Sequence, residues 1–85
     1  MTARVTVYVR PGCHLCTVAL ADLRELRSEQ DFSLEVVDIE SDDALHARYL
    51  ERIPVIALDG HELYDFAVNT ADLSLRLRTV ESTER

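Results

Sequence analysis

The chain is 85 residues long, 47% of its residues are hydrophobic, and its formal net charge is −7. This length suits one domain with its own core, and no apolar run in the sequence is long enough to span a bilayer. An acidic chain lacks the basic patches that bind nucleic acid or an anionic membrane, so we expect neither partner. We expect one monomeric domain at residues 1–80, followed by a frayed tail at 81–85.

The first predicted elements are a strand and a helix. The strand lies at residues 5–9, where β-branched and aromatic side chains precede the Pro11-Gly12 pair. The helix begins at Cys13 or His14 and ends at about Ser28. Its predicted buried stripe follows helical spacing and consists of Leu15, Ala19, Leu23 and Leu26, widened by Val18.

A second strand and a second helix are predicted next. Phe32–Ile39 is the strand, because its central residues are apolar and β-branched. Ser41 is placed to cap the helix, and the two aspartates after it occupy the first turn, where the helix dipole favours negative charge. The helix must end before Pro54, because the residue that precedes a proline is pushed out of the α region.

The second half of the chain predicts a β-hairpin. Residues 54–58 are apolar on both faces, which is typical of a buried strand, and a proline is tolerated at the first strand position. Asp59-Gly60 is the strongest hairpin signal in the sequence. His61–Phe66 is therefore predicted as the antiparallel return strand.

The last segment fits two structures. Its leucines alternate with polar residues, which suits a strand, but Leu73, Leu77 and Val80 also recur at helical spacing. Asn69 followed by Asp72 resembles a capping pair, and a β-α-β-α-β-β order leaves an open sheet face for a last helix to cover. We predict a helix.

Both cysteines of the chain lie in the short segment Arg10–Cys16, where the first strand ends and the first helix begins. Unpaired N–H groups and the positive end of the helix dipole favour a thiolate over a thiol at this position. Because two residues separate Cys13 from Cys16, the second thiol can attack a disulfide that the first one forms. No secretory signal pattern precedes the first strand, so we expect a cytoplasmic protein, in which a cysteine pair is more often catalytic or metal-binding than structural.

These features together resemble the glutaredoxins, a branch of the thioredoxin superfamily. Val7–Cys16 looks like their active-site strand and loop, Ile53-Pro54-Val55 resembles their loop with a cis-proline, and Asp59-Gly60 stands where their hairpin turn does. The resemblance extends over nearly the whole chain. It implies an α/β thioredoxin-like fold of order β-α-β-α-β-β-α, with a four-stranded mixed sheet flanked by helices.

The resemblance also implies a role for each site residue. Cys13 would be the exposed nucleophile, and Cys16 would resolve the mixed disulfide. Arg10 matches a basic residue that favours a thiolate or an anionic thiol substrate. Pro54 would be cis and lie beside the cysteines, which leaves the backbone of Ile53 to pair with a substrate. The implied function is the reduction of disulfides in a protein or small thiol substrate, with no tightly bound cofactor, and with glutathione or a flavin reductase for recycling.

Two departures from the glutaredoxin pattern bear on glutathione. In glutaredoxins, the hairpin is followed in sequence by a Gly-Gly pair and an acidic residue, which hold glutathione. The corresponding segment here, Tyr64–Asn69, contains no glycine. The residues between the cysteines, His14 and Leu15, are not the usual Pro-Tyr pair either. His14 could stabilise the Cys13 thiolate or face solvent, and the sequence leaves both open. We expect a divergent bacterial branch that glutathione reduces poorly.

Two other functions remain open at this stage. Cys13, His14 and Cys16 could bind a metal or an iron-sulfur cluster, with His61 or a second subunit completing the ligands, although a closed zinc site needs four protein ligands. The chain could also be a redox-inert module that binds a partner. The presence of both thiols argues against that role, because an adaptor needs neither.

Overall fold

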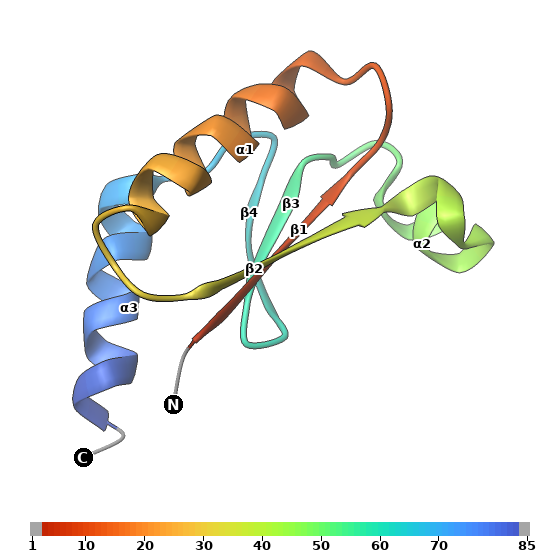
Figure 1. Ribbon diagram of the computed structural model, residues 1–85. Helices are drawn as coiled ribbons and strands as arrows, with labels where there is room; N and C mark the ends of the chain where they lie inside the picture. The colour runs from red at the N-terminus through yellow and green to blue at the C-terminus, as the bar shows by residue number, and fades with distance from the viewer. Residues whose placement is uncertain (1–2, 84–85) are drawn as a thin grey trace.

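The computed structural model describes residues 3–83 of the chain. In chain order its elements are β1 (Arg4–Val9), α1 (His14–Arg27), β2 (Ser33–Asp38), the 3-10 helix η1 (Ile39–Ser41), α2 (Asp43–Tyr49), β3 (Val55–Leu58), β4 (His61–Asp65) and α3 (Thr70–Thr83). The predicted order β-α-β-α-β-β-α is confirmed (Figure 1).

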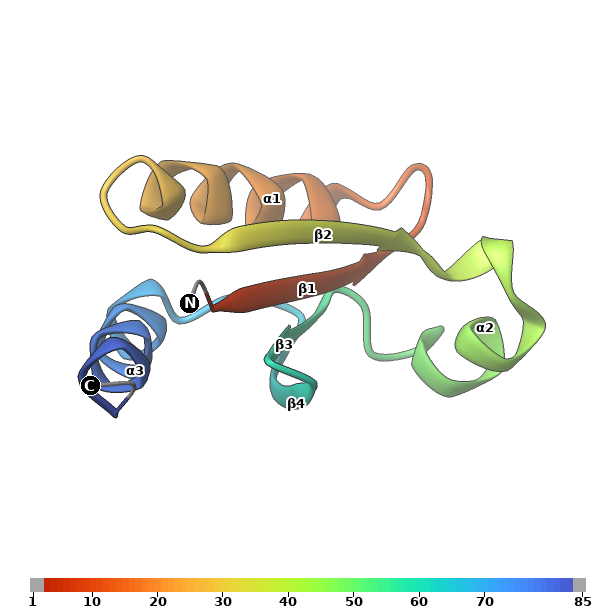
Figure 2. The same cartoon turned by 60° about the horizontal axis from the view of Figure 1, so that its bottom comes forward.

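The four strands form one mixed sheet with the spatial order β2-β1-β3-β4. β1 pairs in parallel with β2 and antiparallel with β3, and β3 pairs antiparallel with β4. All four residues of β3 are buried, as the apolar run predicted. Figure 2 shows α1 running along β2, while α2 projects beyond the C-terminal end of that strand.

The two faces of the sheet pack against different helices. Val7 lies opposite Ile56, which lies opposite Tyr64, so these side chains share one face. Tyr64 donates a hydrogen bond to Asp72 of α3, which places α3 on that face. On the other face, Tyr8 stacks on Tyr49 of α2 with 4.4 Å between ring centroids. α1 packs beside α3, since Gln30, just after α1, donates to the Ser74 carbonyl at 3.2 Å and accepts from the Ser74 hydroxyl at 2.6 Å. The core side chains from these two helices are Ala19, Leu23, Leu26, Leu73 and Leu77.

A bulge in β4 places the side chains of Glu62 and Tyr64 on opposite faces of the sheet. Ile56 pairs with Tyr64, but Ala57 pairs with Glu62, so one extra residue, Leu63, interrupts the ladder. Glu62 and Tyr64 would share a face in a regular strand. With the bulge, Glu62 faces α2 and Tyr64 faces α3.

The buried stripe of α1 is rotated from the predicted one. Cys16 is buried and takes the place assigned to Leu15, and Ala19, Leu23 and Leu26 follow it as predicted. Leu15 and Val18 are 48% and 43% exposed. The prediction was wrong because it treated Cys16 as a site residue only, and one residue along a helix is a turn of about 100°.

The region between β2 and α2 also differs from the prediction. Asp42, not Ser41, caps α2: its Oδ1 accepts hydrogen bonds from the backbone N–H groups of Ala44 and Leu45, at 2.8 and 3.2 Å. Ser41 instead ends η1, where its hydroxyl donates to the Asp38 carbonyl at 2.6 Å. The prediction placed Asp42 in the first turn of the helix, but aspartate is as good a cap as serine, and the helix begins one residue later than predicted. β2 ends at Asp38, before the predicted Ile39.

The hairpin turn and the last helix are as predicted, but β3 begins at Val55 and β4 ends at Asp65, so Pro54 and Phe66 lie just outside the predicted strands. Asp59 and Gly60 have φ values of 49° and 89°, which is the left-handed pair of a type I′ turn. Asn69 caps α3, because its Oδ1 accepts from the Asp72 N–H at 3.0 Å. α3 continues to Thr83, past the expected start of the tail at residue 81, and residues 84–85 lie outside the described part. None of the helices within residues 3–83 has the length and apolarity needed to cross a bilayer.

Candidate functional site

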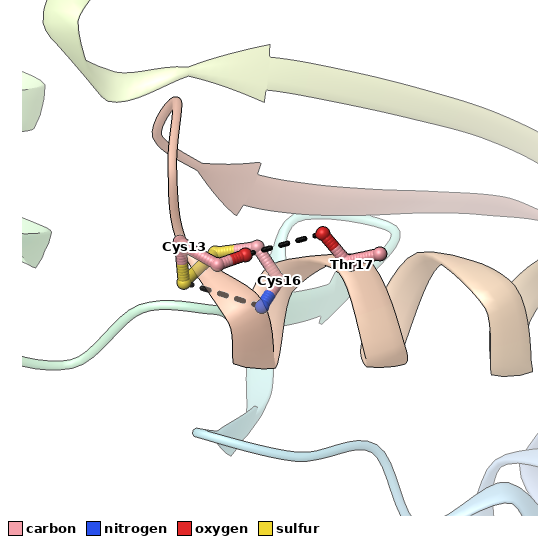
Figure 3. The surroundings of a disulfide bond; sticks show 3 residues. All are labelled: Cys13, Cys16 and Thr17. Carbon is pink, nitrogen blue, oxygen red and sulfur yellow. Dashed lines mark hydrogen bonds between the residues drawn. A yellow bond between two sulfur atoms is a disulfide. The ribbon is translucent and has the colours of Figure 1, made fainter.

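The central strand β1 leads directly into the loop that carries the cysteine pair. β1 lies between β2 and β3, and Gly12, with a φ of 77°, turns the chain back so that α1 can begin. Cys13 is the N-cap of α1, in extended conformation. Its Sγ accepts a hydrogen bond from the Cys16 N–H at 3.2 Å, and its carbonyl accepts one from the Thr17 hydroxyl at 3.3 Å (Figure 3).

Cys13 and Cys16 form a disulfide within the first turn of α1, with Cα atoms 5.2 Å apart (Figure 3). The two residues differ in access. Cys13 is half-buried, whereas Cys16 is 3% exposed and belongs to the hydrophobic core. A reactant arriving from solvent therefore reaches Cys13 first.

Two further segments meet the cysteine end of the sheet. The Ile53-Pro54 bond is cis, as predicted, and both residues are buried. Val55 pairs with Tyr8, so Pro54 lies at the end of β3 that adjoins the loop after β1. The Phe66 N–H donates to the Pro54 carbonyl at 2.8 Å, which attaches the segment after β4 to the same place.

The structure places the charged candidates differently. The Arg10 guanidinium pairs with Glu40 of η1 at 3.2 Å, each side chain being 41% exposed, so its charge is shared with a carboxylate. His14 is exposed at the first residue of α1. His61 opens β4 opposite Leu58, which in turn pairs with Val5 near the start of β1. It therefore lies at the far end of the sheet from the cysteines and cannot complete a metal site with them in one chain.

Metal ligation finds no support within one chain. Residues 3–83 contain no group of three or more His, Cys, Asp or Glu side chains placed to hold an ion. The two sulfurs are bonded to each other.

Sequence reasoning missed a polar network that joins α2 and the following loop to β4. The Arg52 guanidinium makes a two-pronged contact with Asp65, both bonds 3.1 Å long, and reaches Glu62 at 2.6 Å. Glu62 also accepts from the Tyr49 hydroxyl at 2.8 Å and from Arg48 at 3.0 Å. The hydrogen bonds from Arg52 and Tyr49 lower the pKa of Glu62. Burial, together with the Glu62 carboxylate, raises the pKa of Tyr49 to about 12.

This network depends on the β4 bulge, which turns Glu62 toward α2. The sequence carries no signal for the bulge. The arginines of the network precede β3 and its carboxylates lie in β4, so their pairing is set by the strand register.

Comparison with known proteins agrees with this geometry. Residues 4–78 match the family model described as "Glutaredoxin-like domain (DUF836)". An uncharacterized protein of Mycobacterium tuberculosis is 33% identical over 64 residues, which cover 69% of this chain and 66% of that protein, just under two thirds of its length.

Solved structures show the same fold. The solution structure of protein Ne2328 from Nitrosomonas europaea is 32% identical, covers 91% of this chain and 93% of its own, and has a TM-score of 0.79. The crystal structure of protein XcR50 from X. campestris is 33% identical, covers 88% and 96%, and has a TM-score of 0.70. Thioredoxin 1 of Thermosipho africanus, at 20% identity, coverage of 96% and 99% and a TM-score of 0.65, supports the fold alone. The thioredoxin-like fold is thus confirmed, and with its Cys-x-x-Cys pair it supports a function of redox type.

Proposed function

The chain belongs to the glutaredoxin-like domain family, and we propose on that basis that it is a thiol-disulfide oxidoreductase. The observation that carries the proposal is the asymmetry of the cysteine pair. Cys13 is reachable from solvent at the N-cap of a helix, and Cys16 is buried one turn later within bonding distance. This arrangement suits one attacking thiol and one resolving thiol.

In the reduced protein, the Cys13 thiolate attacks one sulfur of a substrate disulfide. A mixed disulfide forms, and the other substrate sulfur leaves as a thiolate. The Cys16 thiolate then attacks Cys13 Sγ, which restores the Cys13–Cys16 disulfide and releases the second substrate thiolate. Two electrons pass to the substrate, and the two protons lost by the cysteines balance those taken up by the products.

The protein supports the first step through its backbone. A thiolate at Cys13 would keep the N–H of Cys16 as a hydrogen-bond donor and would lie at the positive end of the α1 dipole. Arg10 contributes less than the sequence implied, because Glu40 neutralises it in part. We assign Ile53 and Pro54 to the edge on which a substrate backbone rests.

Recycling of the oxidised protein requires an external thiol reductant. We propose a dithiol or a flavin reductase rather than glutathione, because the segment after β4 carries side chains where a close approach of glutathione to the backbone would require glycine. We place the reaction in a reducing compartment such as the cytoplasm.

A trapping experiment tests the cysteine roles. Reduced Cys16→Ser protein, mixed with a peptide that contains a disulfide, should accumulate a covalent mixed disulfide through Cys13. Cys13→Ser protein, treated identically, is the control and should accumulate almost none. Equal trapping by both variants, or trapping by Cys13→Ser alone, would overturn the assignment.

A further inference from the structure

Phe66, directly after β4, has a large exposed apolar side chain on a backbone that disfavours it. Its φ is 70°, in the left-handed region where glycine is the usual residue, and its side chain is 51% exposed. The Ala67 N–H donates to the Asp65 carbonyl at 2.8 Å, which closes a γ-turn around Phe66. A γ-turn with positive φ is rare and strained. Strained residues that persist in a fold cluster at functional sites.

Two sets of contacts hold this turn in place. The Phe66 N–H donates to the Pro54 carbonyl at 2.8 Å. The Arg52 guanidinium donates two hydrogen bonds to the Asp65 carboxylate, one to each oxygen. Arg52 lies just before the cis Ile53-Pro54 bond, and the Pro54 carbonyl lies just after it, so residues on both sides of that bond hold the turn. Arg52 thus links the residue before Phe66 to the loop that holds the cis bond.

The position of Phe66 relates it to the disulfide. Pro54 precedes the residue that pairs with Tyr8, and Tyr8 lies near the end of β1, from which the chain leads to Cys13. Leu15, two residues after Cys13 in the first turn of α1, is another exposed apolar side chain, at 48%. Phe66 and Leu15 are thus two exposed apolar residues at the end of the sheet where the chain enters the Cys13–Cys16 site.

We propose that Phe66 is the specificity-determining residue of the Cys13–Cys16 site, and that it selects polypeptide dithiols with an apolar side chain beside the reacting cysteine. This inference rests on the proposed function and names its reductant. An apolar neighbour gains by burial against Phe66, whereas glutathione brings two carboxylates, no apolar side chain and a charge of the same sign as the protein's −7.

The step itself conserves atoms and electrons. A partner thiolate attacks Cys13 Sγ, the Cys13–Cys16 bond breaks, and Cys16 leaves as a thiolate. The second thiol of the partner then attacks the mixed disulfide, so the partner is oxidised to a disulfide and this chain is reduced by two electrons.

Competition between reductants tests the inference on the full chain. Loss of the Cys13–Cys16 disulfide is followed with glutathione, with a synthetic dithiol peptide that carries leucine beside its first cysteine, and with the same peptide carrying serine. Each rate is divided by the rate with dithiothreitol, so that general reactivity cancels. We expect the leucine peptide to react faster than the serine peptide by about tenfold, as for one apolar contact in a site.

Variants of Phe66 make the test specific. Phe66→Gly, which suits the φ of 70°, should remove most of the preference for leucine and raise the relative rate of glutathione. Phe66→Leu should keep the preference. Leu75→Ala, which removes a side chain 61% exposed on α3, is the control and should keep it too.

Two failures are distinguishable. If dithiothreitol opens the disulfide but Phe66→Gly keeps the full leucine preference, the role of Phe66 is wrong and the oxidoreductase function stands. If the protein opened by dithiothreitol cannot pass its electrons to any disulfide, the proposed function fails and this inference fails with it.

Discussion

Cys13 and Cys16 have the same side chain but different surroundings, so we expect their thiols to differ in reactivity. Cys13 caps α1 and accepts the N–H of Cys16, while Cys16 points into the core beside Ala19 and Leu23 on the buried stripe. Burial in apolar surroundings disfavours a thiolate, and a helix N-terminus favours it. The roles that we propose for the two sulfurs would thus follow from their positions one helical turn apart.

Alkylation rates of the reduced protein test this difference. We predict that Cys13 reacts first with iodoacetamide and that its rate is half-maximal below about pH 8.5, the midpoint for an unperturbed thiol. Mass spectrometry locates the modified residue, and the Cys16→Ser variant isolates the Cys13 profile. If Cys16 is modified first, or if the Cys13 midpoint lies at or above that of a free thiol, the asymmetry does not control reactivity.

At the scale of elements, the turns and helix starts that depend only on neighbouring residues were predicted well. Asp59-Gly60 specified its turn, and Asn69 specified the start of α3, because a turn or a cap is decided within four residues. Where two residues competed, the sequence could not choose, as for Ser41 and Asp42. The predicted burial of Leu15 was wrong because Cys16 occupies that place in the core, and which of two adjacent helix residues faces the sheet is decided by packing, not by local sequence.

The cap of α3 offers a stability test of one element. Asn69→Ala removes the acceptor of the Asp72 N–H, and we expect it to lower the free energy of unfolding by about 1 kcal/mol. Asn69→Asp retains an acceptor oxygen and is the control. Urea denaturation measures both variants. Equal stability of Asn69→Ala and the wild type would show that the cap contributes nothing.

At the scale of the whole molecule, the long-range contacts of the site were beyond the sequence. The sequence predicted the cysteine pair, the cis Pro54 and their order in the chain. It did not predict the hydrogen bond from Phe66 to Pro54 or the two hydrogen bonds from Arg52 to Asp65. They depend on the register of β3 with β4 and on the bulge at Leu63. No local pattern encodes these, since a shift of one residue would send each side chain to the other face.

The network around Glu62 gives stability a predictable dependence on pH. Hydrogen bonds from Arg52 and Tyr49 lower the pKa of Glu62 in the folded protein below its ordinary 4.5. A carboxylate whose pKa is lower in the folded than in the unfolded protein stabilises the fold at pH values above the unfolded-state pKa. That contribution is lost as the pH falls through the folded-state pKa.

Glu62→Gln should therefore be less stable than the wild type at pH 7, by about 1 kcal/mol, since the carboxylate is partly solvent-exposed. The difference should shrink toward zero near pH 3, as urea denaturation at both pH values would show. Glu51→Gln changes an exposed glutamate just after α2 and should have no effect at either pH. A difference that stays constant with pH would mean that the Glu62 charge does not act through this network.

Electron transfer from the cysteine pair to a substrate is the central claim, and a stoichiometric reduction measures it most directly. Fully reduced protein is freed of reductant and mixed with an equal amount of a peptide disulfide, and the thiols on both molecules are counted. We predict that peptide thiols appear as protein thiols disappear, two for two, with the Cys13–Cys16 disulfide as the protein product. A peptide disulfide that stays intact, beside a protein that keeps both thiols, would contradict the claim.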